Sequence, residues 1–173
     1  KPGERPEMWN LTRPEEITAI HRAYFEAGSH VVCANTFGAN SLHFPGAELE
    51  PVVAAALANA RAARVASAGE QEKVVALDIG PTGRLLKPYG DLDFEEAVAV
   101  FARTVRLGVQ YGADLILIET MNDSYETKAA LLAAKENSTL PVFVSNAYGE
   151  DGKLMTGASP AAMVATLEGM GAD

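Results

Sequence analysis

The sequence lacks features that would place it in several other protein classes. Its single cysteine, Cys33, cannot form a disulfide within the chain, which fits a reducing compartment and predicts a cytoplasmic protein. No apolar run approaches the roughly 20 residues that a membrane-spanning helix needs. Basic residues are also few, because 14 Lys and Arg stand against 23 Asp and Glu and give a net charge of −9. This charge argues against binding to nucleic acid or to an anionic membrane surface.

The residues that are present predict one domain built from alternating strands and helices. The chain has 173 residues, of which 48% are hydrophobic, enough for a single ordinary domain with a real core. Buried strands are expected at 30–36, 74–78, 115–119 and 141–146. Helices are expected at about 12–27, 49–68, 94–111 and 123–135, and from 159 onward.

Strict alternation of strands and helices predicts an α/β fold with a parallel sheet and right-handed crossovers. Periodicity does not separate a (β/α)8 barrel from an open, doubly wound sheet. Four strands complete neither of these folds, and a four-stranded parallel piece would leave both sheet edges bare.

Local patterns predict how the helices begin and which sides they bury. Thr12 and Glu15 have the spacing of a capping box at the start of the first helix. Ile17, Ile20, Tyr24 and Ala27 share one side of that helix and are expected to be buried. Asp93 is expected to cap the third long helix. The apolar sides of the later helices are expected to contain Val98, Phe101, Val105 and Val109, then Ala129, Leu132 and Ala133, and finally Met163, Val164 and Leu167.

Glu119 is the most informative polar residue in the chain. It follows four uninterrupted aliphatic residues, 115–118, so it stands at the carboxyl end of a strand that is buried on both faces. Ligands bind at this end of the strands in β/α folds. A carboxylate there needs a partner because burying an unpaired charge is costly. Glu119 therefore either binds a ligand or pairs with a basic neighbour that holds a loop.

Six stretches, in order and at similar spacing, resemble the homocysteine-binding domain of cobalamin-dependent methionine synthase. No single stretch is decisive, but together they span nearly the whole chain. The form Gly-Pro-Thr-Gly looks more like the cobalamin-dependent branch than the betaine or S-methylmethionine branches. The stretches are Leu11-Thr-Arg-Pro-Glu15, Ala34-Asn-Thr-Phe-Gly-Ala-Asn40, Asp78-Ile-Gly-Pro-Thr-Gly-Arg-Leu-Leu-Lys-Pro88, Gly90-Asp-Leu-Asp-Phe94, Ile118-Glu-Thr-Met-Asn-Asp123 and Thr156-Gly157.

The resemblance implies that residues 1–173 are a single, incomplete domain: a partial (β/α)8 barrel holding the second to fifth strands of the family with their helices. The family binds zinc through three cysteines, which by this register fall beyond Asp173. Cys33 matches none of them and is expected to be a small core residue. We therefore expect no metal ligand and no catalytic residue in the chain. The chain is a segment of a longer protein, is missing residues, or is a paralogue without its metal; we favour the first two.

The family transfers a methyl group from methylcobalamin to the sulfur of homocysteine, giving methionine, after zinc has deprotonated the thiol. Zinc and methylcobalamin are thus the cofactors implied for the intact protein, and cobalamin- and folate-binding modules are the implied partners. For this chain the resemblance implies the part of the site that binds the amino-acid end of homocysteine. Alternatives are a betaine- or S-methylmethionine-type homocysteine methyltransferase, or a binding fragment that has lost its metal.

Seven residues are the candidates for this substrate site, and each has a structural alternative. Glu119 is expected to bind the ammonium group, with Asp123 either assisting or only capping the next helix. Asn35 and Thr36 match an Asn-Thr pair that lines the family's pocket, but they also suit an Asx-type turn.

Gly80, Thr82 and Gly83 are expected to bring backbone N–H groups to the pocket mouth, or to serve only as a turn. Asp78 is expected to have a structural role, while Ser145 and Asn146 are weaker candidates for hydrogen bonds to the substrate.

Overall fold

Four parallel strands form the centre of the structure, a computed structural model that describes residues 3–173. They are β1 (Val31–Cys33), β2 (Val74–Ile79), β3 (Leu115–Met121) and β4 (Val142–Asn146), and they lie side by side in their order along the chain. Each neighbouring pair is parallel. The predicted α/β fold with four parallel strands is confirmed, although β1 is shorter than expected.

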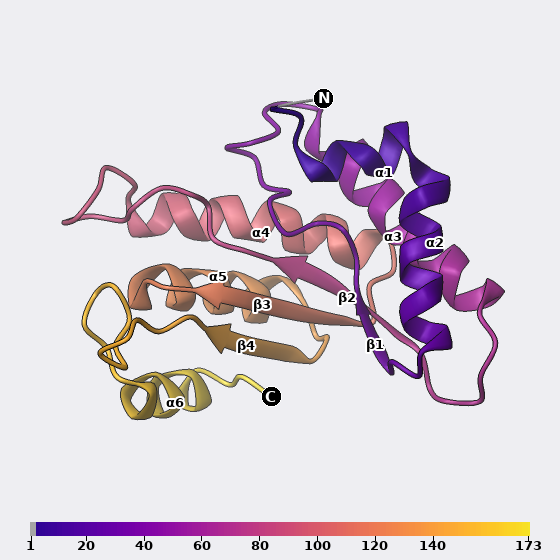
Figure 1. Cartoon of the computed structure of the whole chain (residues 1–173). Coiled ribbons are helices and arrows are strands. Elements are labelled where there is room, and N and C mark those ends of the chain that lie inside the picture. The colour runs from indigo at the N-terminus through magenta and orange to yellow at the C-terminus, as the bar shows by residue number, and fades with distance from the viewer. Residues whose placement is uncertain (1–2) are drawn as a thin grey trace.

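The helices follow the strands in turn and pack on one face of the sheet (Figure 1). A sheet whose strands keep their chain order, with helices on one face, is a section of barrel wall. A doubly wound sheet reverses its strand order and carries helices on both faces. The helices are η1 (Pro6–Met8), α1 (Trp9–Thr12), α2 (Pro14–Glu26), α3 (Leu49–Ala66), α4 (Phe94–Gln110), α5 (Ser124–Asn137) and α6 (Pro160–Gly169).

The main core lies between this sheet face and the helices. Alternate strand side chains point to opposite faces of a sheet. Val75, Leu77 and Ile79 of β2 all join the buried cluster, together with Ile116 and Ile118 of β3. These five side chains are at most 3% exposed. The side chains that face the helices therefore hold the strands in place, and the side chains on the opposite face are not needed for this packing.

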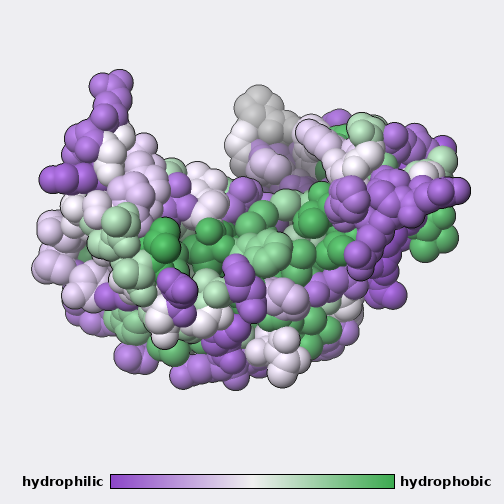
Figure 2. All heavy atoms as spheres, turned by 90° about the horizontal axis from the view of Figure 1, so that it is seen from below, coloured by the Kyte–Doolittle hydropathy of each residue, from purple (hydrophilic) through white to green (hydrophobic). Residues whose placement is uncertain are grey.

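The opposite face of the sheet carries the side chains that would line the inside of a barrel. Cys33 is in register with Ala76, and Ala76 with Leu115, so these three share that face. No helix within residues 3–173 covers it (Figure 1). Phe143, in register with Leu117, remains 43% exposed. Seen from below, the molecule has a hollow between two raised, mostly hydrophilic ends, with a band of hydrophobic surface beneath it (Figure 2).

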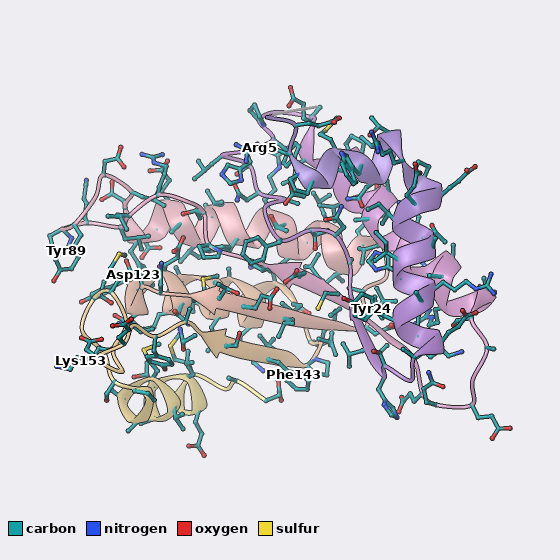
Figure 3. The ribbon with its side chains drawn as sticks, in the orientation of Figure 1. Arg5, Tyr24, Tyr89, Asp123, Phe143 and Lys153 are labelled. Atoms are coloured by element: carbon teal, nitrogen blue, oxygen red, sulfur yellow. The ribbon has the colours of Figure 1, made fainter. Side chains whose placement is uncertain are left out.

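The predicted N-cap of the first long helix was wrong, and of its predicted buried residues Ile17 is buried while Ile20, Tyr24 and Ala27 are exposed. Thr12 ends α1, and its hydroxyl donates to the carbonyl of Met8, while α2 begins after Arg13 without a side-chain cap. Ile20 and Tyr24 are 49% and 61% exposed. They lie on the side of α2 next to the open edge of β1, where the described chain offers no covering element; Figure 3 shows Tyr24 beside β1. The buried side of α2 contains Ile17, as expected, together with His21 and Phe25.

Two further residues that were expected in the core are exposed, Val109 at 43% and Val164 at 64%, because each lies on the outer side of its helix. The other apolar residues expected on the buried sides of the later helices are buried or partly buried. Asp93 occupies the N-cap position of α4 but makes no cap hydrogen bond. Its carboxylate pairs with Lys87 at 2.9 Å instead. None of the helices within residues 3–173 combines the length and the apolar character required to cross a membrane.

Replacing Gly108 with alanine should destabilise the protein. A Cβ at this position of α4 would lie 2.4 Å from Cδ2 of the fully buried Leu77. The resulting overpacking costs about 1–3 kcal/mol, against a gain of about 1 kcal/mol for alanine over glycine in a helix. We expect a net loss of about 1 kcal/mol in urea denaturation. Gly169→Ala is the matched control, because a Cβ there meets nothing within 4 Å, and equal effects of the two changes would contradict the packing argument.

The isolated chain should associate with itself. Both β1 and β4 are edge strands, and exposed strand edges are templates for pairing with another chain. The uncovered sheet face adds apolar side chains such as Val31 and Phe143, which are 41% and 43% exposed. Sedimentation of residues 1–173 should therefore show dimers or larger species. A well-folded monomer at high concentration would contradict this expectation.

Candidate functional site

The predicted site residues all lie at the carboxyl end of the sheet. Asn35 and Thr36 follow β1, and residues 80–83 follow β2. Glu119 is in the last part of β3, and Asp123 is the second residue after this strand. Figure 3 shows Asp123 at this end, together with Tyr89 and Lys153 from the loops after β2 and β4. Because these strands are parallel, one rim of the sheet gathers residues that are far apart in the sequence.

Glu119 and Asp78 form the electrostatic centre of this rim. Asp78 is in register with Leu117, so Glu119, two residues farther on, points to the same face. The two residues therefore stand on one face of adjacent strands, close enough for the charge of Glu119 to act on the Asp78 carboxyl group. Asp78 is only 6% exposed. Burial, followed by the charges of Glu119 and Glu7, raises the pKa of Asp78 to about 8, because like charges at close range cannot both ionise easily.

The backbone leaves the regular strand geometry immediately after Glu119. Thr120 has a φ of 60°, a left-handed conformation that is unusual for a β-branched residue. The register of β3 and β4 is irregular between Ile118 and Met121. The N–H of Thr120 donates to Oγ of Ser145 at 3.3 Å. Such strain costs on the order of 1–3 kcal/mol and is held only where the surroundings fix it, most often at functional sites.

Asn35 and Thr36 make hydrogen bonds within the chain. Nδ2 of Asn35 donates to the carbonyl of Pro6 at 3.0 Å and to Oδ1 of Asn10 at 3.1 Å, which ties the first helical segment to the end of β1. The hydroxyl of Thr36 donates to the carbonyl of Asp78 at 2.8 Å, and Oγ1 accepts the Asp78 N–H at 3.0 Å. Thr36 therefore fixes the backbone that carries the Asp78 carboxyl group.

The N–H groups of Gly80 and Thr82 also have partners within the chain. Gly80 donates to the carbonyl of Phe37 at 2.9 Å. A side chain at Gly80 would collide with the Phe37 ring, 2.6 Å from an ideal Cβ, so glycine here permits close packing of the loop after β1. The N–H and hydroxyl of Thr82 both donate to Oε1 of Glu126, at 2.8 and 2.6 Å. Gly83 has a φ of 80° and is exposed.

Asp123 caps α5, the structural role considered for it. Its Oδ1 accepts the N–H of Tyr125 at 2.7 Å, and the residue is 2% exposed. Asn146 is likewise engaged, since its Nδ2 donates to the carbonyl of Met121 and to Oγ1 of Thr127. These bonds hold the end of β3 and the start of α5 beside β4.

Two buried glutamates near the rim were missed by sequence reasoning. Glu126 is 3% exposed, and burial raises its pKa although the two Thr82 donors oppose this shift. Glu126 is three residues after Asp123, a spacing that suggests a local capping box rather than a long-range contact with Thr82. Glu7 is 5% exposed and accepts the Gly38 N–H at 2.7 Å. No local pattern marks Glu7, because its partner lies 31 residues away.

A cavity of about 450 Å³ lies between α2 and β1 and reaches the rim at Asp78 and Asn35. Its walls are mostly apolar. Two buried side-chain atoms within residues 3–173 have no hydrogen-bond partner, Nε2 of His21 and Oδ1 of Asp78. Both residues line this cavity. Burial lowers the pKa of His21 and so favours its neutral form.

The described residues do not fit a zinc site. Cys33 is the only cysteine of the chain. Burial and then the charges of Asp78 and Glu119 raise the pKa of its thiol to about 12, whereas a metal ligand must be a thiolate. No group of three or more His, Cys, Asp or Glu side chains within residues 3–173 is arranged to hold a metal ion. We therefore assign no metal-dependent step to these residues.

Asp78→Asn should change how stability depends on pH. Because the pKa of Asp78 lies above its ordinary value of 3.8, at about 8, the folded protein holds this proton more tightly than the unfolded chain does. Its contribution to the unfolding free energy falls as pH rises between these two values, by at most about 1.4 kcal/mol per pH unit. Urea denaturation across this range should show a smaller fall for the variant. Asp91→Asn, which alters an exposed carboxylate, should behave like the wild type. If the unfolding free energies of all three proteins depended on pH in the same way, the raised pKa of Asp78 would be contradicted.

Comparison with known proteins identifies the family. A family model described as homocysteine S-methyltransferase matches residues 3–173. Two relatives, both named methionine synthase, come from Mycobacterium leprae and Mycobacterium tuberculosis. They are 28% and 29% identical to this chain over 96% of its length, and the chain spans 15% of theirs.

Crystal structures of the homocysteine methyltransferase MmuM from Escherichia coli share the fold. The metallated form has a TM-score of 0.82 at 22% identity, covering 95% of this chain and 64% of that one. The apo form has a TM-score of 0.76 and covers 98% and 63%. The partial barrel seen here is thus the fold of a homocysteine methyltransferase. With the match over residues 3–173, these comparisons show that the chain belongs to the homocysteine S-methyltransferase family.

Proposed function

We propose that this chain binds the amino-acid end of homocysteine in an enzyme that methylates the homocysteine sulfur to give methionine. The observation that carries the proposal is the pair of carboxyl groups, Asp78 and Glu119, at the carboxyl end of the sheet. They stand on the same face of adjacent strands, and no described ion pair neutralises them. An ammonium group is the part of homocysteine that such a pair would bind.

Glu119 is the proposed direct ligand of the ammonium group. It is half-buried at the rim, whereas Asp78 is deeper. Asn35, Thr36, Gly80, Thr82, Gly83 and Asp123 are proposed to shape the same site. Asn35 would do so from the wall of the cavity, which it lines. The hydrogen bonds of Thr36, Thr82 and Asp123 within the chain point to positioning roles.

The donor and cofactors follow from the family branch that the motifs resemble. We propose methylcobalamin as the methyl donor and zinc as the group that activates the thiol, in a cytoplasmic protein. Because the described residues supply no zinc ligands, the metal would be held by residues outside this chain. Cobalamin- and folate-binding modules would be the partners. Residues 1–173 would then be one incomplete barrel domain, whose free edges at β1 and β4 pair with further strands.

Glu119→Gln tests the proposal in the protein that contains this chain. Loss of the charge should weaken homocysteine binding by about 1.5–3 kcal/mol, the contribution of a charged hydrogen bond, or about 10- to 150-fold in Kd. Isothermal titration calorimetry measures this directly. Glu16→Gln is the matched control, because Glu16 is exposed on α2. An unchanged Kd for Glu119→Gln would remove this residue from the site.

A further inference from the structure

Asp78 is an unusual side chain because it is buried, acidic and only partly satisfied. Its residue is 6% exposed, and Oδ1 has no hydrogen-bond partner although it lines the cavity beside β1. Its near neighbour is another carboxyl group, Glu119, rather than a cation. The ion pairs among the described side chains involve other carboxylates: Glu26, Asp91, Asp93, Asp114 and Asp173. The negative charge at this site therefore has no built-in counterion there.

The pair cannot relax by moving apart. Asp78 and Glu119 stand on adjacent strands whose outward neighbours, Leu77, Ile79 and Ile118, are at most 3% exposed in the core. Thr36 fixes the Asp78 backbone at both its N–H and its carbonyl. The repulsion between two carboxylates held close together in a poorly solvated place is relieved by a proton or by a cation.

We infer that Asp78 and Glu119 act as one carboxyl pair, which shares a proton in the absence of ligand and releases it when a substrate ammonium group binds. This inference rests on the proposed function. The exchange balances: the singly protonated pair has one negative charge, the ammonium group brings one positive charge, and one proton leaves to solvent. The bound state then has two carboxylates beside one cation. Asp78 is thus assigned a part in substrate binding that goes beyond its structural setting.

The other titratable groups around the pair do not replace it in this role. Glu7, from η1, is already engaged within the chain, because its Oε1 accepts the Gly38 N–H. Cys33, from β1, stays a thiol because burial and the two carboxylates raise its pKa. His21, from α2, lines the same cavity and is kept neutral by burial. The pair is the remaining member of this cluster that would change its charge near neutral pH.

Proton release on homocysteine binding tests the inference. Calorimetric titrations at neutral pH, in buffers of different ionisation enthalpy, give the number of protons released. We expect the wild-type protein to release about one proton more than Asp78→Asn, because the variant has a single carboxylate and no shared proton. Any proton from the homocysteine thiol contributes equally to both proteins and cancels in this difference. Asp91→Asn, at an exposed position, should release as many protons as the wild type.

The possible outcomes separate this inference from the proposed function. If wild-type protein does not bind homocysteine, the proposed function fails. If it binds, and Asp78→Asn binds with the same proton release, the shared proton is wrong while the function stands. If Asp78→Asn does not bind, thermal unfolding distinguishes misfolding from a lost ligand group. The Kd of the wild type then decides, because at pH values below the apparent pKa of the pair it must rise about tenfold for each unit by which the pH is lowered; a flat profile would overturn the inference.

Discussion

Repulsion between two carboxyl groups that cannot separate is the constraint around which this rim of the sheet is organised. Asp78 and Glu119 are carried by neighbouring strands, and the opposite faces of those strands are locked into the helical layer. The fold thus stabilises an arrangement that its own electrostatics disfavours. The backbone of Thr120, directly after Glu119, is likewise held in an unfavourable left-handed conformation by its surroundings.

The separation of the two sheet faces explains how the protein supports such a site. The outward face is filled by aliphatic side chains and by α3, α4 and α5, and it provides the stability of the described chain. The inward face has small or apolar residues nearer the amino ends of the strands and acidic residues at their carboxyl ends. Burial on one face therefore leaves the other free to carry groups that would be unfavourable in a core.

Sequence patterns predicted the fold better than the details of the site. The uninterrupted aliphatic run at 115–118 predicted β3, because a parallel strand that is buried on both faces needs apolar side chains on both. The strand order and the one-sided helical layer then separated a barrel wall from a doubly wound sheet, a choice that periodicity had left open. The buried side of α2 was mispredicted because its apolar residues form two stripes, and only the neighbouring elements decide that His21 is covered while Tyr24 is not.

The candidate site was partly predictable from the sequence. Glu119 was identified because a carboxylate after four aliphatic residues is conspicuous. Asp78 was expected to be structural, since its proximity to Glu119 depends on the pairing of β2 with β3. Glu7 and Glu126 were missed for a related reason: their partners, Gly38 and Thr82, lie 31 and 44 residues away. Contacts across such distances depend on tertiary structure, which local patterns do not encode.

The placement of the two acids on strands, with Thr36 bridging to one of them, also bears on how such a protein can diversify. The long connections after β1 and β2 can gain or lose residues without shifting the charges, because neither acid is carried by them. In the proposed function, recognition of the amino-acid group would thereby be uncoupled from recognition of the rest of the substrate. Descendants of one ancestral scaffold could exchange methyl donors through their loops while retaining the same anchor for the common part of the substrate.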